Sequence, residues 1–393
     1  MNLKEMDQNY VLQTYARNYV HFVKGENSIL YDAEGRDYVD FGSGIAVCSV
    51  GHGNRRLADA ICDQAGKLIH TSNLYLIEPQ ARLAKRLAEL SGYDVKTFFA
   101  NSGAEANEGA IKMARKYGEV EGEVKRYKII TLEHSFHGRT ITALKATGQE
   151  AMHNYFGPFP DGFVYARDIE HIYDLIDDHT VAVMIELVQG EGGVQPMEVD
   201  EVKRLAKRLK SEDILLIVDE VQTGIFRTGE VLASNLYEIT PDIITLAKGL
   251  GGGVPIGAIL TTHKEILGLG EHGSTFGGNF LSTRAALEVL AILEEHKESG
   301  ALDHALILFE ERLKKIAEKY PDIFEKEVGV GFMRGLRVKG DKEAGDVVAA
   351  ALIERVVVLK AGKNTVRFLP VLTITKEEME LGFERFERAL SSL

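Results

Sequence analysis

Lys248 is the side chain around which a reactive site can be built. It follows a short β-branched run, Ile243–Leu246, and precedes Gly249 and three consecutive glycines at 251–253. The apolar run is typical of a buried strand, and the glycines permit a loop whose backbone approaches a ligand closely. A lysine held there is partly desolvated, which disfavours its ammonium form, and the neutral amine is a nucleophile for Schiff-base formation. The alternative is a lysine that extends from a strand end to water.

Asp219 ends another apolar run, Leu215–Val218. A carboxylate delivered to the end of a buried strand needs a partner, and a cationic ring nitrogen would suit it. A magnesium-binding aspartate of the Walker B type requires a GxxxxGK[ST] loop, which the sequence lacks. A purely structural aspartate remains the other interpretation.

A third candidate is the junction at Ser102, Gly103 and Ala104, where a strand-like stretch meets a helical one. The N–H groups of a helix N-terminus and a serine hydroxyl bind an anion such as phosphate, although an ordinary serine N-cap has the same sequence. Together with Lys248 and Asp219 this is the layout of a pyridoxal phosphate site. The lysine forms the Schiff base, the aspartate keeps the pyridine nitrogen protonated, and the helix holds the phosphate.

Further polar residues lie in glycine-flanked loops. Phe136 follows a candidate strand and could stack on a flat ring, and Arg139 is a candidate for binding a carboxylate, or else a solvated loop arginine. No acidic residue or HExxH spacing makes the nearby histidines a zinc site, so we expect no metal. Three more candidates are Glu191 in a glycine-rich turn, the 273–279 loop with Ser274 and Thr275, and Arg367 inside an apolar run.

The elements that position these residues alternate between strand and helix from about residue 51. This alternation predicts an α/β fold with a mostly parallel sheet, whose ligands bind outside the carboxyl ends of the strands. We expect a large domain at 51–289. A smaller α+β domain is expected from 1–50, a helical arm with a hairpin, together with 290–393. The final helix is expected to be capped by Thr375 and Glu378.

Composition narrows the classes of partner. The 393 residues carry a formal net charge of −13, which argues against nucleic acid or an anionic membrane as a partner. No apolar run is long enough to span a membrane, and the first residues contain no apolar signal core. The two cysteines form no disulfide framework, so we expect a cytoplasmic protein.

With these residues in place, the chain resembles the class III (subgroup II) aminotransferases, which have the PLP-dependent transferase fold type I. The resemblance runs from about Phe41 to Arg367. Leu187 stands where the family usually has proline, and Cys48 where it usually has asparagine. The motifs that carry the resemblance are NSGAEANE at 101–108, FHGRT at 136–140, QGEGGV at 189–194, DEVQTG at 219–224, AKGLGGG at 247–253 and STFGGN at 274–279.

The resemblance implies a role for each candidate. Lys248 would also shuttle the proton, Phe136 and Val221 would enclose the ring, and Gln222 would approach its phenolic oxygen. Thr275 would reach the phosphate bound by a neighbouring subunit, which implies a homodimer with shared active sites. The implied cofactor contacts are Ser102, Gly103, Ala104, Phe136, Asp219, Val221, Gln222, Lys248 and Thr275.

The implied substrate contacts are Arg139, Glu191, Ser274 and Arg367. Arg367 would hold the α-carboxylate of glutamate. Arg139 would hold glutamate's distal carboxylate or the α-carboxylate of an ω-amino substrate, and Glu191 would pair with Arg367 when that second substrate binds.

The implied reaction moves the ω-amino group of N2-acetyl-L-ornithine to 2-oxoglutarate, in arginine biosynthesis. Ornithine, succinylornithine, succinyl-diaminopimelate and 4-aminobutyrate are alternative donors with the same residues. A nicotinamide oxidoreductase is disfavoured because Arg334 stands where a GxGxxG motif starting at Gly329 needs its third glycine. A non-catalytic binding protein is a remote alternative that would need neither Lys248 nor Asp219.

Overall fold

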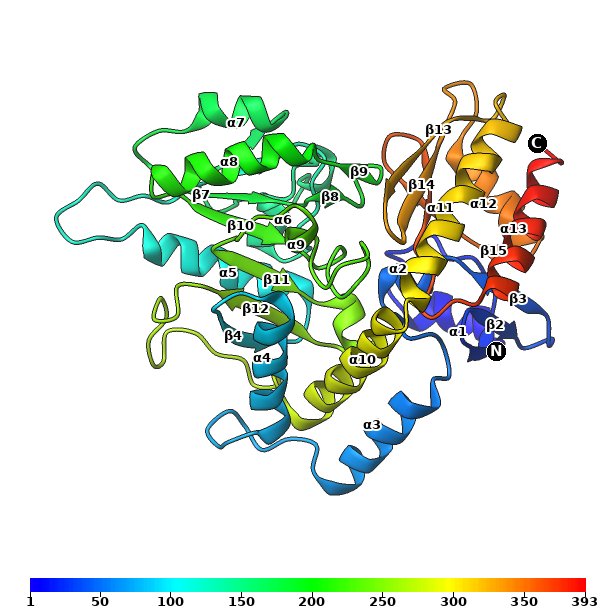
Figure 1. Ribbon diagram of the computed structural model, residues 1–393, viewed down its shortest axis with the longest axis horizontal. Helices are drawn as coiled ribbons and strands as arrows, with labels where there is room; N and C mark the ends of the chain where they lie inside the picture. The colour runs from blue at the N-terminus through cyan, green and yellow to red at the C-terminus, as the bar shows by residue number, and fades with distance from the viewer.

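The computed structural model describes residues 1–393, and its largest element is a seven-stranded sheet (Figure 1). Only β12 runs antiparallel to its neighbours, so the mostly parallel sheet predicted from the sequence is confirmed. Across the sheet the strands are β4 Lys96–Ala100, β12 Gly257–Thr261, β11 Ile243–Leu246, β10 Leu215–Asp219, β7 Thr180–Ile185, β5 Lys128–Leu132 and β6 Phe163–Ala166.

Helices cover both faces of this sheet, which explains why its central strands are apolar throughout. In β10, Leu216 and Val218 pack in a cluster with α7 and α8, whereas Leu215 and Ile217 pack in a second cluster with α5. The helices of this part are α3 Arg55–Lys67, α4 Glu78–Ser91, α5 Gly103–Tyr117, α6 Ile141–Ala146, α7 Ile169–Leu175, α8 Val199–Ser211, α9 Ala233–Leu236 and α10 Phe280–Glu298. A two-stranded ribbon, β8 Val188–Gln189 with β9 Gln195–Pro196, completes it.

The N-terminal and C-terminal parts of the chain form two further sheets of four strands each (Figure 1). The first is β1 Phe22–Glu26, β2 Ile29–Asp32, β3 Asp37–Asp40 and β15 Val356–Val357, with β15 parallel to β3. The second is β13 Phe324–Val330, β14 Met333–Val338, β17 Thr365–Phe368 and β16 Leu359–Ala361. Their helices are α1 Leu3–Tyr10, α11 Ala301–Lys319, α12 Ala344–Ile353 and α13 Lys376–Leu390.

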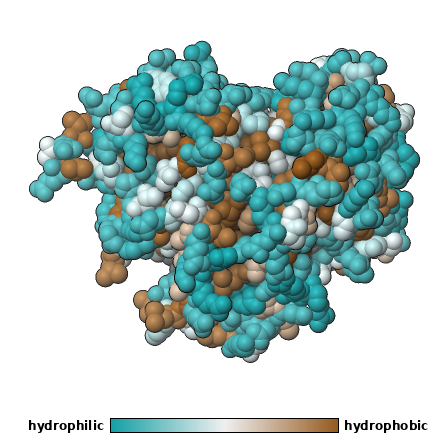
Figure 2. Space-filling view, viewed as in Figure 1, coloured by the Kyte–Doolittle hydropathy of each residue, from teal (hydrophilic) through white to brown (hydrophobic).

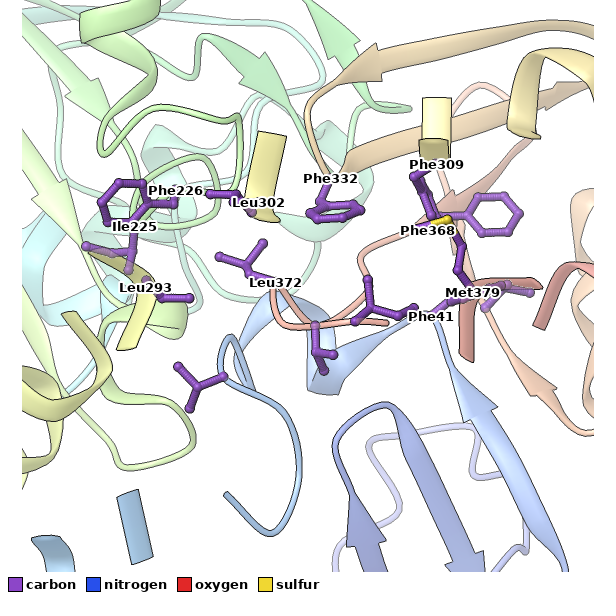
Figure 3. Packing of buried hydrophobic residues seen from close by; sticks show 14 of the residues in the cluster. Phe41, Ile225, Phe226, Leu293, Leu302, Phe309, Phe332, Phe368, Leu372 and Met379 are labelled. Atoms are coloured by element: carbon purple, nitrogen blue, oxygen red, sulfur yellow. The ribbon is translucent and has the colours of Figure 1, made fainter. Parts of the chain in front are cut away.

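The largest hydrophobic cluster joins these sheets to α10 and α11. Phe41 lies among Phe309, Phe368 and Phe383, with ring centroids 5.1 to 6.1 Å away. Figure 3 shows Phe41, Phe309 and Phe368 in this cluster. The same cluster continues to Leu293 on α10, so a single core links the N-terminal hairpin, the C-terminal segment and the edge of the large sheet.

Two local features are not predicted from the sequence, and one prediction is confirmed. The sequence predicts a helical arm and a two-stranded hairpin at the N-terminus, but a further strand, β1, precedes the hairpin; its Lys24 and Gly25 interrupt any apolar alternation. The segment around Gly44, which has the sequence Gly-Ser-Gly, is a left-handed turn, α2 Ser43–Ala46, for which the sequence analysis predicts no structure. The capping box of α13, between Thr375 and Glu378, is present as predicted.

The surface agrees with the composition. Hydrophilic residues cover most of the face in Figure 2, and none of the helices has the length and apolar character needed to cross a bilayer.

Candidate active site

The structure brings most of the predicted residues together at the carboxyl ends of the parallel strands. Asp219 ends β10, and Lys248 follows β11 after one residue. These ends surround a cavity of about 410 Å³, within the range usual for cofactor and small-molecule sites. Of the residues proposed from the sequence, its walls contain Ser102, Gly103, Ala104, Phe136, Arg139, Glu191, Asp219, Val221, Gln222 and Lys248.

The N-terminus of α5 forms one wall of the cavity. Ser102 is the N-cap, and its hydroxyl accepts a hydrogen bond from the N–H of Glu105 at 3.2 Å. A Cβ on Gly103 would lie 2.7 Å from a methyl group of Val221, so only glycine lets the helix end approach that side chain. The backbone donors and positive dipole end of a 15-residue helix therefore face the cavity.

Asp219 is fixed by three hydrogen bonds. Its Oδ2 accepts one from Asn107 Nδ2 and one from His137 Nδ1, both at 2.8 Å, and its Oδ1 accepts one from the N–H of Val221 at 3.0 Å. Asn107 is oriented in turn by the hydroxyl of Thr245, 2.7 Å from its Oδ1. These contacts hold the carboxylate of Asp219 at the cavity wall in a single orientation.

His137 and Asn107 are functional candidates that the sequence reasoning missed. The sequence analysis treats the histidines near Phe136, one of which is His137, only as possible zinc ligands, and no cluster of metal-ligating side chains exists. Its buried Nε2 has no partner, whereas its Nδ1 faces Asp219, so the tautomer that leaves no donor unpaired carries the proton on Nδ1. The available signals were the position of His137 directly after Phe136, and of Asn107 one turn after Gly103 on the same helix face.

Lys248 opens the short 3-10 turn after β11, with a φ of 41°. Burial lowers the pKa of its amine, and the positive charge of Arg367 lowers it further. The carboxylates of Asp219, Glu191 and Glu186 act in the opposite direction. The net effect is a lowered pKa, which makes the neutral amine that nucleophilic chemistry requires easier to form.

Arg367 lies on β17 with only 2% of its surface exposed. Its guanidinium donates to Glu191 Oε1 at 2.7 Å and to Gln222 Oε1 at 3.4 Å, and its Nε has no partner. Arg139 is different, because its side chain is exposed and lies over the ring of Phe136, 5.5 Å from the ring centre. The site thus contains one arginine paired with a carboxylate and one open to a ligand.

Glu186 is a buried carboxylate between two loops of the site. Its Oε2 accepts a hydrogen bond from the N–H of Phe136 at 3.0 Å, and its Oε1 one from the N–H of Gly190 at 3.4 Å. Burial raises the pKa of Glu186 to about 7, and the negative charge of Asp219 adds to the rise, whereas the neighbouring His137 and the N–H groups of Phe136 and Gly190 oppose it. The sequence analysis assigns no role to Glu186.

Three predicted residues are not part of the cavity lining. One is Arg367, which contacts the lining residues Glu191 and Gln222, and the other two are Thr275 and Ser274. Thr275 is exposed and lines a separate hollow that also contains Asn73 and Leu74. Ser274 lines that hollow too, and its hydroxyl accepts a hydrogen bond from Asn101 Nδ2 at 3.1 Å. Asn101 borders the main cavity, so the two hollows are neighbours.

The residues present fit pyridoxal 5′-phosphate. The helix N-terminus offers donors for a phosphate, the fixed carboxylate of Asp219 offers an acceptor for a ring N–H, and Phe136 and Val221 offer apolar surfaces. Lys248 lies in the same cavity and can supply the amine. This donor set matches what the cofactor requires of a protein.

Comparison with known proteins places this geometry in one family. The family model for "Aminotransferase class-III" matches residues 11–390. An acetylornithine aminotransferase of Wolinella succinogenes is 62% identical over 99% of both chains. A relative of the same name from Caldanaerobacter subterraneus subsp. tengcongensis is 44% identical over 98% of both chains.

Solved structures agree with the sequence comparison. An ornithine aminotransferase from Toxoplasma gondii superposes with a TM-score of 0.92 at 32% identity, covering 99% of this chain and 94% of that one. An N-acetylornithine aminotransferase from Stenotrophomonas maltophilia superposes with a TM-score of 0.85 at 33% identity, covering 99% of both chains. With a family model spanning nearly its whole length and these full-length relatives, the chain belongs to the class III aminotransferases.

Proposed function

We propose that this enzyme transfers the ω-amino group of N2-acetyl-L-ornithine to 2-oxoglutarate, giving N-acetylglutamate 5-semialdehyde and glutamate, a step of arginine biosynthesis. The observation that carries the proposal is the Arg367–Glu191 ion pair in the same site as Lys248. A paired arginine beside an open one, Arg139, suits a site that must accept two substrates of different charge. The full-length relatives named for acetylornithine support the choice of donor.

The cofactor is pyridoxal 5′-phosphate, which withdraws electrons from the substrate carbon when it is bound. Asp219 would accept a hydrogen bond from the ring nitrogen, with Asn107 and His137 holding its carboxylate. Gln222 would approach the phenolic oxygen. Ser102 and the N–H groups of Gly103 and Ala104 would hold the phosphate, and Phe136 and Val221 would enclose the ring.

Lys248 moves the proton in both half-reactions. Its neutral Nζ accepts a proton from the carbon that carries the amino group and returns one on the way to the product. Because burial and Arg367 both lower the pKa of Lys248, its neutral form is easier to reach than that of an exposed lysine, which suits a base.

Arg367 and Glu191 provide the change of specificity between the half-reactions. With glutamate, Arg367 leaves Glu191 and binds the α-carboxylate, while Arg139 binds the distal carboxylate. With the acylated donor, Arg367 stays paired and Arg139 binds the α-carboxylate. Ser274 contributes to the substrate side through its contact with Asn101.

The enzyme works as a homodimer in this proposal. Leu76 and Phe276 are large apolar side chains that are 99% and 61% exposed. Asn73 Nδ2 donates to the carbonyl oxygen of Ser274 at 3.1 Å. The loop that carries Leu76 and the loop that carries Phe276 are therefore joined and form one surface beside Thr275. A second copy docked there covers this surface and receives Thr275 at its own phosphate site.

The oligomer is tested with Leu76→Asp. We expect sedimentation velocity to shift from dimer to monomer and the affinity for the cofactor to fall. Ile353→Asp on α12, where the side chain is 80% exposed, is the matched control and stays dimeric. A wild-type protein that sediments as a monomer contradicts the shared site. A cytoplasmic location is also proposed, supported by the free thiols Cys48 and Cys62.

The reaction is tested by single-turnover absorbance of the cofactor. Purified enzyme is mixed separately with glutamate, N-acetylornithine, ornithine and 4-aminobutyrate, and the visible band is followed as it disappears. We expect fast conversion with glutamate and N-acetylornithine only. Fast conversion with ornithine or 4-aminobutyrate instead overturns the assigned donor, and no conversion with any amine overturns the aminotransferase chemistry of Lys248.

A further inference from the structure

The turn α2 Ser43–Ala46 adopts a conformation that its sequence disfavours. All four residues have positive φ: 43° at Ser43, 65° at Gly44, 66° at Ile45 and 61° at Ala46. The left-handed region is costly for every residue with a Cβ and most unusual for a β-branched one such as Ile45. Such strain persists only where the surroundings hold it, and it gathers at functional sites.

An ion pair and two side-chain hydrogen bonds hold this turn and the residues that follow it. Asp40 Oδ1 accepts hydrogen bonds from the N–H groups of Gly42 and Ser43 at 2.8 and 2.9 Å, and Asp40 Oδ2 lies 2.8 Å from His52 Nε2. The hydroxyl of Ser43 donates to the carbonyl of Leu369 at 2.6 Å. This hydrogen bond fixes the turn to Leu369, two residues beyond Arg367.

The second hydrogen bond is made to Gly249, the residue after the reactive lysine. The hydroxyl of Ser49 donates to the carbonyl of Gly249 at 2.7 Å, and a Cβ on Gly249 would lie 3.5 Å from the carbonyl oxygen of Ala46. The turn and the segment that follows it therefore lie beside Gly249, the residue next to Lys248.

His52 is fixed from its own side. Its backbone pairs with Asn27, and its Cβ lies so close to Gly25 that a side chain at that position would overlap it. Burial would lower the pKa of His52, but hydrogen bonds and charge from Asp40, with a contribution from Cys48, raise it to about 10. His52 and Asp40 therefore form a charged pair at neutral pH.

The turn delivers one side chain to the active site. Val47 follows it and lines the cavity, the only lining residue that precedes Asn101 in the chain. Its β-branched side chain has few rotamers, so the backbone of the turn sets its position. An apolar wall favours a neutral acyl group over the charged α-ammonium of an unacylated amine, since a charge loses its hydration there.

We infer that Val47 is a specificity-determining residue for the acylated donor and that Asp40 and His52 are positioning residues acting through it. This inference rests on the proposed function. Glutamate is a shorter substrate without an acyl group, so its half-reaction does not depend on this wall.

The test compares kcat/KM for N-acetylornithine with that for ornithine in single-turnover half-reactions of the holoenzyme. Val47→Ala and Val47→Thr each lower this ratio by about tenfold, the lower end for a lost methyl-sized contact. The glutamate half-reaction stays within about threefold. His52→Gln lowers the ratio in the same direction, whereas His263→Gln, which disrupts a 3.1 Å histidine–aspartate pair with Asp242, leaves it unchanged.

A double-mutant cycle separates positioning from general destabilisation. If His52 acts through Val47, the variant with both Val47→Ala and His52→Gln has the ratio of Val47→Ala alone. Equal loss from His52→Gln in both backgrounds, or a loss of thermal stability with an unchanged ratio, overturns the positioning role. An unchanged ratio in both Val47 variants overturns the specificity role. If these variants still convert glutamate at the normal rate, the aminotransferase activity is intact, and only the role proposed for Val47 or His52 has failed.

Discussion

Replacing Glu191 by glutamine should shift the preference of the enzyme between its two amino donors. The change keeps the shape of the side chain and removes the charge that pairs with Arg367 at 2.7 Å. Glutamate must displace Glu191 from Arg367 before its own carboxylate can bind, and the acylated donor must leave the pair intact. The two donors therefore respond in opposite directions.

The magnitude follows from the geometry. A hydrogen bond to a charged group contributes about 1.5–3 kcal/mol. Glu191 keeps 31% of its side chain exposed, so the lower part of that range applies. About 1.4 kcal/mol corresponds to tenfold, so kcat/KM for glutamate should rise about tenfold. The acylated donor should lose by a similar factor, because Arg367 is buried and then carries an unpaired charge.

The assay is the single-turnover half-reaction with each donor at saturating cofactor. Glu327→Gln is the control, since Glu327 pairs with Arg334 at 2.7 Å in the small sheet, outside the cavity. Equal losses with both donors would show that Glu191 only supports the fold. An unchanged preference would show that Arg367 does not alternate between protein and substrate.

Three further predictions concern Asp219, Glu186 and Phe309. Asp219→Asn should lower kcat by about 10²–10³-fold, the usual effect of removing one preorganised electrostatic contact, as measured in both half-reactions. The pKa of Glu186 is about 7, above its ordinary 4.5, so the folded state holds the extra proton and the free energy of unfolding falls as pH rises from 4.5 to 7. Urea titrations between pH 4.5 and 7 should show that the free energy of unfolding falls by up to about 3 kcal/mol. The Glu186→Gln variant should not show this fall. Phe309→Ala, at a fully buried ring, should cost about 3–5 kcal/mol in the same titrations, and a cost below 1 kcal/mol would contradict its central place in the core.

Much of the site could be anticipated because apolar runs deliver polar residues to one edge of a parallel sheet. Asp219 and Lys248 each follow such a run, and parallel strands place their carboxyl ends together. Ser102 follows a third strand at a helix start, which has its own signature. For these residues local pattern and global topology point to the same place.

The rest depends on contacts between distant parts of the chain. His137 and Asn107 meet Asp219 across 82 and 112 residues, and no local pattern relates them. The reversed direction of β12 was equally hidden, because an apolar run has no polarity that distinguishes parallel from antiparallel pairing. The left-handed turn at Ser43–Ala46 contains only one glycine. Its conformation is therefore imposed by hydrogen bonds to Asp40 and Leu369, and the amino-acid types alone do not predict it.

The pairing of Arg367 also bears on the reactivity of Lys248. Arg367 lowers the pKa of Lys248, and Glu191 raises it. In either half-reaction Arg367 faces one carboxylate, from the protein or from glutamate, so the net charge near Lys248 stays nearly constant while the substrates alternate. The amine can therefore keep the same protonation state in both directions, as a reversible proton transfer requires. With Glu191→Gln this balance is lost only for the acylated donor, so its kcat, and not only its KM, should respond.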